Sequence, residues 1–349
     1  MRTPLTLAVA AGPHAAWELK RAFGDLPDAE VRWISESDLQ GFVAVRDQQS
    51  GATVRFEHVV EDESVDAVVL ALPIAVGAEF ARRALAADKH VLLRGPIARA
   101  SDEAEQLLSL ALARDRCLMP LYPPLFDPAV QALKAELDAG RLGDVYYGHA
   151  ARHEAGRPDG GDGVVWRHGA EAVALVLELL GDRPIEVSGS AESYLSADEP
   201  DVVFCELRFA TGIVFNLRLS CLDLEATRSI TVVGSRFTAT YDELRPADRR
   251  LMLYQRLPVS AGGEEEHRFR CGDIVTPRVP DADPLRSACR QFVAQVRASR
   301  PAIVGPDGAA VVEVLEALER SIQRSGTTQV LGTRQDPPLR VLTGGHGLA

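Results

Sequence analysis

The chain has 349 residues, enough for two ordinary cores, and its 46% hydrophobic and 25% charged residues are proportions of a folded globular protein. Its formal net charge of −12 argues against binding to nucleic acid or an anionic membrane, because acids outnumber the cations that would neutralise phosphates. No apolar run approaches the roughly 20 residues of a membrane span, and the first residues resemble a strand more than a signal peptide, so we expect a soluble, cytoplasmic protein.

The first 122 residues alternate apolar strands with helices. The pattern predicts strands at 5–11, 29–35, 66–73, 90–94 and 116–122, and helices at 15–26, 78–89 and 101–115. Strands that are apolar on both faces and separated by helices indicate a parallel, doubly wound sheet. We therefore expect a Rossmann-like dinucleotide-binding domain over residues 1–122.

A different pattern begins after residue 122. Helices are predicted at 128–143, 164–181, 284–299 and 307–324, and strands at 144–154, 202–210, 213–222, 230–235, 238–243 and 251–256. Successive strands joined by short turns predict an antiparallel sheet with one covered face. Residues 123–349 are therefore expected to form an α+β domain with a large, mostly antiparallel open sheet, and the tail after 326 is expected to pack loosely or to extend toward a partner.

The turn after the first strand is where a dinucleotide fold holds the pyrophosphate. Ala10, Gly12 and Ala15 occupy its three glycine positions, so only the middle glycine is present. Glu36 follows the second strand, near the position of the acid that binds the ribose of NAD. Two interpretations stay open: weakened NAD(P) binding, or a Rossmann-shaped domain whose loop no longer holds a nucleotide.

Cysteine and histidine spacing gives no sign of a metal site. The five cysteines are scattered, odd in number and without a CxxC pair, which indicates buried thiols in a reducing compartment. No HExxH-type arrangement occurs, so no metal cofactor is expected.

Several segments resemble the Gfo/Idh/MocA oxidoreductases over nearly the whole chain. They are HVLLRGPIARASDEAEQLLSLA, LMPLYPPLFDPAVQALKAELDAGRLGDVYYG, ITVVGSRFTATYDELRP, GDIVTP and DPLRSACRQF. The nearest branch oxidises the 3-position of UDP-linked amino-sugar acids and related nucleotide sugars. The resemblance implies NAD(P) and a sugar-like ligand in a cleft between two domains, and a homodimer or homotetramer formed through the open sheet.

The first catalytic stretch of that family departs from its pattern here. The family reads Glu-Lys-Pro where this chain reads Arg94-Gly95-Pro96, so the lysine that holds the reacting hydroxyl falls on a glycine. Lys89 cannot replace it, because it lies at the opposite end of the same strand. By the same resemblance, Pro73 and Arg94 are expected beside the cofactor.

The second catalytic stretch departs as well. In VVWRHGAEAV the family's aspartate falls on Arg167 and its histidine on Glu171. In the neighbouring loop, PLYPPLFDP, Tyr122 takes a histidine's place and Asp127 an asparagine's. A group that exchanges protons near neutral pH has thus become a carboxylate.

Three functions follow from these replacements. The first, which the sequence favours, is a pseudo-dehydrogenase that binds a ligand or supports a protein partner. The second is an NAD(P)-dependent oxidoreductase on a sugar or nucleotide sugar, with Tyr122 or Glu171 as the proton-transfer group and Arg94 or Arg167 as the cation that tunes it. The third is a non-redox enzyme that uses the cluster formed by RHE (152–154) and RHGAE (167–171), which includes His168.

Overall fold

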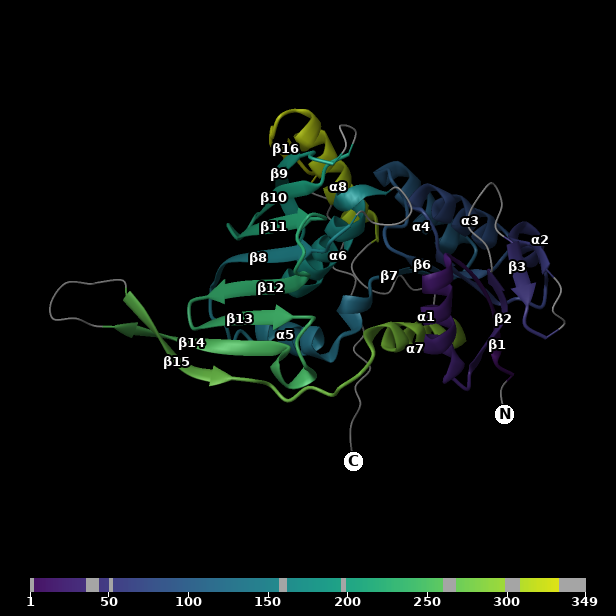
Figure 1. Ribbon diagram of the computed structural model, residues 1–349, viewed down its shortest axis with the longest axis horizontal. Coiled ribbons are helices and arrows are strands. Elements are labelled where there is room, and N and C mark those ends of the chain that lie inside the picture. Colours follow the sequence, from purple (N-terminus) through teal and green to yellow (C-terminus); the bar gives the residue numbers. More distant parts are fainter. Residues whose placement is uncertain are drawn as a thin grey trace.

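The computed structural model describes residues 3–35, 44–49, 53–156, 162–195, 199–259, 268–298 and 308–332. Two sheets dominate it, a smaller one built by the first part of the chain and a larger one built by the second (Figure 1). Each is covered by helices, and the two lie side by side. The predicted fold class, a doubly wound parallel sheet followed by a large, mostly antiparallel one, is confirmed.

The first sheet has the strand order β4-β3-β2-β1-β5-β6-β7. Its strands are β1 (Leu5–Ala11), β2 (Ala29–Ser35), β3 (Ala44–Asp47), β4 (Thr53–Arg55), β5 (Ala67–Ala71), β6 (His90–Arg94) and β7 (Leu118–Leu121). The neighbours in the stretch β2-β1-β5-β6-β7 are all parallel. At the other edge of the sheet, β3 runs antiparallel to both β2 and β4. The central strands are buried on both faces, which is why they read as continuous apolar runs.

Helices cover both faces of this sheet. They are α1 (Pro13–Gly24), α2 (Phe56–Val60), α3 (Ile74–Ala86) and α4 (Ser101–Ala113), joined by α7 (Pro284–Arg297) from the far end of the chain. Alternate residues of β6 separate the two layers: Leu93 packs in the cluster with α3 and α4, and Leu92 in the cluster with α1 and α7. Because α7 lies against α1, the second part of the chain completes one face of the first sheet.

The second sheet has the order β15-β14-β13-β12-β8-β11-β10-β9-β16. Its strands are β8 (Val145–His153), β9 (Pro184–Glu192), β10 (Val202–Phe209), β11 (Val214–Ser220), β12 (Thr227–Gly234), β13 (Phe237–Asp242), β14 (Leu251–Val259), β15 (Arg268–Val275) and β16 (Gln329–Val330). The pair β8–β11 is parallel and the other described pairs are antiparallel. The tail after 326 thus contributes β16, and residues 333–349 lie outside the described part.

One face of the second sheet is covered and the other is open. The covering helices are α5 (Pro128–Asp138), α6 (Gly163–Leu180) and α8 (Gly308–Gln323), and short 3-10 turns occur at η1 (Pro123–Phe126) and η2 (Ala247–Arg249). Strand alternation places Ala150 and Leu217 under the helices, both at most 5% exposed. Tyr147 and Phe204 point to the open face and are 46% and 50% exposed.

The connection between the sheets is fixed by a buried carboxylate. The Asp127 side chain, 1% exposed, caps α5 by accepting the Ala129 backbone N–H at 2.8 Å. It also accepts the Tyr241 hydroxyl and the Arg250 guanidinium, each at 3.0 Å. These contacts tie the connecting segment to the second sheet. The domain boundary at residue 122 stays a prediction, since α7 crosses back to the first sheet.

None of the five cysteines, all of which the structure describes, forms a disulfide. Cys117, Cys205, Cys221 and Cys289 are buried as expected, and burial raises the pKa of the Cys117 thiol to about 12. Cys271 differs, because it lies on the exposed edge strand β15. Among the described helices, none has the length and apolar character needed to cross a membrane.

Candidate functional site

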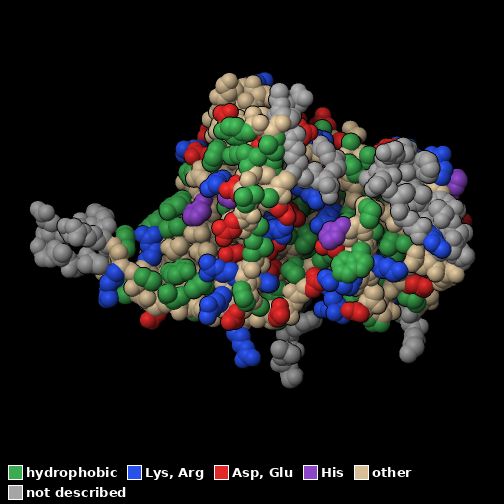
Figure 2. Space-filling view, in the orientation of Figure 1, with side chains coloured by type: hydrophobic (Ala, Val, Ile, Leu, Met, Phe, Trp, Pro, Cys, Tyr) green, Lys and Arg blue, Asp and Glu red, His purple; other side chains and the backbone are tan. Residues whose placement is uncertain are grey.

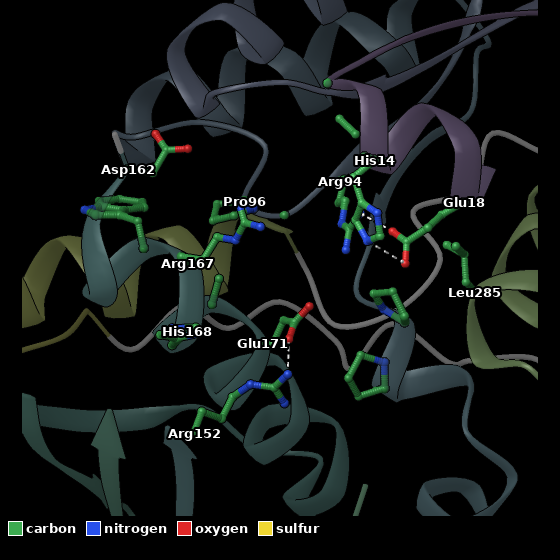
Figure 3. Close-up of a pocket in the computed structure, with 18 of the residues that line it drawn as sticks. His14, Glu18, Arg94, Pro96, Arg152, Asp162, Arg167, His168, Glu171 and Leu285 are labelled. Atoms are coloured by element: carbon green, nitrogen blue, oxygen red, sulfur yellow. Dashed lines mark hydrogen bonds and ion pairs between the residues drawn. The ribbon is translucent and has the colours of Figure 1, made fainter. Parts of the chain in front are cut away.

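A cleft of about 830 Å³ lies between the two sheets, at the carboxyl ends of β1, β5 and β6 (Figure 3). Ligand pockets commonly measure roughly 300–1,000 Å³, so the cleft has room for a large ligand. Acidic, basic and histidine side chains gather side by side over this region in Figure 2. The lining from the first sheet includes Gly12, Pro13, His14, Ala15, Glu18, Leu72, Pro73, Ile74, Arg94, Gly95 and Pro96. The lining from the second includes Arg152, Glu154, Asp162, Trp166, Arg167, His168, Glu171, Arg228 and Glu243.

The amino end of α1 forms one wall of the cleft. Gly12 precedes the helix with φ −62°, and a Cβ added there would meet no protein atom within 4 Å, so the cleft opens directly beside this backbone. The first N–H groups of a helix have no intrahelical partner and suit an anion, although Pro13 at the first position removes one donor. Ala15 lines the cleft, whereas Ala10 is fully buried in β1. Glu36 lies outside the described residues.

These residues fit a dinucleotide. An open glycine beside a helix amino end supplies backbone donors without a side chain in the way. Ser35 joins the carboxyl ends of β2 and β1 beside this turn, since its hydroxyl donates to the Ala11 carbonyl at 2.5 Å and accepts the Ala11 N–H at 2.8 Å. Cations are also present: Arg94 at the end of β6 and, when protonated, His14 on α1.

The end of β6 carries a charge but no amine. The Arg94 guanidinium forms an ion pair with Glu18 of α1 at 3.2 Å. Gly95 has φ +87°, a left-handed conformation that glycine adopts without strain, and nothing lies within 4 Å of where its Cβ would be. Lys89, at the start of this strand, is buried and donates to the carbonyls of Asp62 and Val65 at 2.7 and 2.8 Å.

The second sheet and α6 present a continuous chain of charges, here named the charge chain: Glu171, Arg152, Glu243, Arg228 and Glu154. Arg152 donates to Glu171 and, at 3.4 Å, to Glu243. Arg228 bridges Glu243 at 3.1 Å and both oxygens of Glu154 at 3.2 Å. Arg152 and Arg228 are register partners on β8 and β12, which is how strand pairing assembles the chain.

Within the charge chain, Glu171 is the carboxylate that points into the middle of the cleft (Figure 3). Burial alone would raise the pKa of Glu171, but the charges on Arg152, Arg94 and Arg228 outweigh it and lower the pKa below its usual value. The side chain is 24% exposed, so an ionised carboxylate meets any ligand that enters. Glu171 can therefore accept a proton or a hydrogen bond.

The other predicted site residues on α6 and its surroundings behave differently. Burial, and next the charge on Arg152, lower the pKa of His168 to about 4, so its imidazole is neutral at pH 7. Its Nε2 is buried without a hydrogen-bond partner among the described residues. Arg167 lines the cleft and is exposed. Tyr122 is 1% exposed, lies outside the described lining, and has its pKa raised by burial and by Glu171.

Asp162 connects the two halves of the cleft. Both of its carboxylate oxygens lie 3.2 Å from the Ile74 N–H, the first N–H of α3, which follows Pro73. Arg99 lies 3.8 Å away. Burial raises the pKa of Asp162, and the Ile74 N–H and Arg99 offset only part of that rise. An anion from the second part of the chain thus occupies a helix amino end of the first.

Comparison with known families settles what kind of protein has this cleft. Residues 14–122 match the oxidoreductase family with an NAD-binding Rossmann fold, and residues 130–240 match the GFO/IDH/MocA C-terminal domain. The chain belongs to the Gfo/Idh/MocA family. Together the two matches place both walls of the cleft within that family, and the resemblance noted from the sequence is confirmed.

Relatives within the Gfo/Idh/MocA family include enzymes named for dTDP-sugars. A dTDP-3,4-didehydro-2,6-dideoxy-alpha-D-glucose 3-reductase of Streptomyces violaceoruber is 36% identical over 126 residues, 36% of each chain. A protein of the same name from Saccharopolyspora spinosa is 24% identical over 94% of this chain and its own full length. The matched segments span about a third to a half of the first three curated relatives.

Solved structures share the fold. A variant of KijD10, a 3-ketoreductase from Actinomadura kijaniata, in complex with TDP-benzene and NADP, superposes with a TM-score of 0.73. The match covers 92% of this chain and 98% of that one at 20% sequence identity. At this identity the likeness shows the fold alone.

Sequence reasoning did not single out several residues of the cleft. Glu18, Asp162, Arg228 and Glu243 are brought there by packing between elements far apart in the sequence. Of these, Glu18 carried a usable signal, since it stands one helical turn after His14 on the same face of α1. Asp162 lies in the glycine-rich stretch before α6, and such stretches are common before helices without any role in a site. His153, grouped with the predicted cluster, is outside the described lining.

Proposed function

We propose that this chain is an NAD(P)-dependent oxidoreductase of a sugar or nucleotide sugar, in which Glu171 takes the proton of the reacting hydroxyl. The observation that carries this proposal is the ionised Glu171 carboxylate in the cleft, at the position where the family motif has its histidine. The names of the dTDP-sugar relatives support the substrate class.

The dinucleotide, which supplies the hydride acceptor when bound, would be held by Gly12, by the N–H groups of His14 and Ala15, and by Pro73 and Arg94. Glu171 accepts the hydroxyl proton, a role that general bases fill with a gain of roughly 10²–10⁴ in rate. An ionised carboxylate favours oxidation of a hydroxyl over reduction of a carbonyl at neutral pH, because it has no proton to give.

Arg152 has two tasks in this proposal. It keeps Glu171 ionised, and its buried guanidinium fixes the direction of that carboxylate. The rest of the charge chain leaves Glu154 about half exposed at the far end, where its carboxylate can accept sugar hydroxyls. Tyr122 is given no role, since its hydroxyl is buried away from the lining.

A second candidate is a non-catalytic binding protein of the same fold. The position of the family's lysine, Gly95, leaves open space, and Arg152 neutralises the one carboxylate that replaces the histidine. Both observations favour a cleft that binds ligand without turnover. A protein of this kind would support an active partner or sense a sugar nucleotide.

The experiment combines binding with turnover. NADH and NADPH are titrated by nicotinamide fluorescence, and NAD⁺ or NADP⁺ reduction is followed over a panel of UDP- and dTDP-sugars. Glu171→Gln should lower kcat by about 100-fold or more while leaving dinucleotide affinity within about twofold. Glu178→Gln is the matched control, because Glu178 lies two turns further along α6, near Lys134.

Each outcome selects one function. Turnover that Glu171→Gln abolishes and Glu178→Gln keeps supports the oxidoreductase. Dinucleotide binding without turnover on any sugar supports the binding protein. Consumption of a sugar nucleotide with no change in nicotinamide absorbance would mean a non-redox enzyme, and absence of dinucleotide binding would overturn the proposal.

We also propose that copies of this chain associate as a homodimer or homotetramer through the open face of the second sheet. Tyr147 and Phe204 support this, as large side chains about half exposed on that face. Light scattering during size-exclusion chromatography should give a multiple of 37.7 kDa for the wild type. Phe204→Glu should shift it to the monomer, and a wild-type monomer would refute this assembly.

A further inference from the structure

The wall of the cleft formed by the first sheet and α1 contains an ion pair. One member is a cation, which attracts the phosphates of a dinucleotide, and the other is an anion, which repels them. Arg94 ends β6 and Glu18 lies on the second turn of α1, and their side chains point toward each other (Figure 3). Because β5 lies between β1 and β6 in the sheet, the pair spans the carboxyl end of β5. The Arg94 Nη1 atom is 3.2 Å from the Glu18 Oε2 atom. His14 approaches the other oxygen of Glu18 at 3.6 Å. The Glu18 carboxylate therefore contacts both Arg94 and His14 on this side of the cleft.

The pair is placed where a ligand can reach it. The side chains of Arg94 and Glu18 are 33% and 28% exposed, and both line the cleft together with Gly12 and Ala15. Ion pairs with this exposure are weak, because water and salt screen them. A ligand with two adjacent negative charges can therefore displace the carboxylate from the guanidinium.

The amino end of α1 needs such a cation. Pro13 removes one of its backbone donors, and the first glycine position of the turn is Ala10. Arginine offers a planar fork that pairs with two phosphate oxygens at once, which suits a diphosphate. The cleft's arginines on the second sheet, Arg152 and Arg228, are already bound to the glutamates of the charge chain.

We infer that Arg94 contacts the diphosphate of the dinucleotide and that Glu18 is an internal competitor that must release it. The inference rests on the proposed dinucleotide binding. It assigns Arg94 to the diphosphate and adds Glu18 as a residue with the opposite effect on affinity. Arg94 supplies a contact to the diphosphate in place of the one that the incomplete glycine turn lacks. Glu18 lowers the resulting dinucleotide affinity, because it competes for the same guanidinium. A purely structural ion pair has no such opposition, since loss of either member would act in the same direction.

The test measures NADH affinity by fluorescence in the intact protein. Arg94→Gln should weaken binding about tenfold, the cost of losing one charge-assisted contact. Glu18→Gln should tighten binding by about two- to fivefold, because it frees Arg94. Arg82→Gln, which breaks the exposed Arg82–Glu79 pair on α3 at 2.9 Å, is the control and should leave affinity unchanged. Inorganic pyrophosphate, used as a competitor of NADH, should follow the same order.

The outcomes separate this inference from the function it rests on. Weaker NADH and pyrophosphate binding in both Arg94→Gln and Glu18→Gln would make the pair structural and overturn the inference alone. Equal NADH binding by wild type and both variants would also overturn the inference alone. Tight binding only in Glu18→Gln supports the inference and means that the wild-type cleft is held closed to cofactor by its own carboxylate. Absence of NADH and pyrophosphate binding in every variant overturns both.

Discussion

Replacing Gly95 by alanine tests whether backbone conformation alone keeps a side chain out of the end of β6. Nothing lies within 4 Å of the Cβ that the substitution would add, so no steric clash contributes. The φ of +87° remains, and a left-handed conformation costs a residue with a Cβ about 1–2 kcal/mol. Alanine recovers about 0.4–1 kcal/mol by restricting the unfolded chain. The net expectation is a loss of about 1 kcal/mol.

Gly12 provides the matched control. Its Cβ would also meet nothing within 4 Å, but its φ is −62°, which any residue adopts. Alanine gains the same amount of about 0.4–1 kcal/mol here but is a poorer N-cap residue for α1 than glycine, so Gly12→Ala should change the free energy of unfolding by less than about 0.5 kcal/mol. Urea unfolding followed by circular dichroism measures both variants, and 1 kcal/mol corresponds to a midpoint shift of about 0.3 M for a slope near 3 kcal/mol/M.

Equal stability of the two variants would refute the reasoning. If instead only Gly95→Ala is destabilised, then Gly95→Lys meets the same backbone cost. A variant that restores the family's lysine must therefore be shown to fold before its activity is measured, because a rescue that fails through unfolding would say nothing against hydride transfer.

Three further predictions concern buried charges. Arg152→Leu leaves the carboxylate of Glu171 without its main partner and should lower the free energy of unfolding by about 3 kcal/mol in urea; a change below about 1 kcal/mol would mean that the charge chain contributes little to the fold. The pKa of Asp162 is raised in the folded state, so the folded form binds the proton more tightly and stability falls as pH rises through that pKa. Wild type should therefore lose stability relative to Asp162→Asn as pH rises above the ordinary aspartate value of about 4, and parallel pH profiles would contradict this. Asp127→Ala removes a helix cap and leaves the Tyr241 hydroxyl without its acceptor, for a loss of about 2–3 kcal/mol, of which Asp127→Asn should recover about 1 kcal/mol in thermal melts; equal losses would refute the capping role.

The fold could be predicted from the sequence where local pattern and tertiary environment agree. Residues 5–11 and 90–94 form strands with the predicted bounds, because each is a mostly apolar run between clear breaks. β9, at residues 184–192, was not predicted, because its small and polar residues pair between two other strands and bury little of their own. α1 begins two residues earlier than predicted, since Pro13 is a favourable first helical residue.

The site could be predicted where the dinucleotide turn or the family motif supplied positions. The turn supplied Gly12 and Ala15, the motif supplied Arg94, Gly95 and Glu171, and all of them line the cleft. The resemblance also grouped Arg152 with Glu171, and the two form an ion pair in the structure. The pairing of Arg94 with Glu18 was not predicted, because the two meet only across the end of β5. No local sequence pattern indicates a pair between side chains that are so far apart in the sequence.

The position of α7 has a consequence for the way the protein is made. Phe292 and Val293 of α7 are buried in the same cluster as Leu19 and Phe23 of α1, more than 260 residues earlier in the chain. A ribosome that has released only the first 122 residues has produced every strand of the first sheet but not the helix that seals one of its faces. We expect that fragment to expose an apolar surface and to aggregate, and co-expression with residues 268–298 to rescue it.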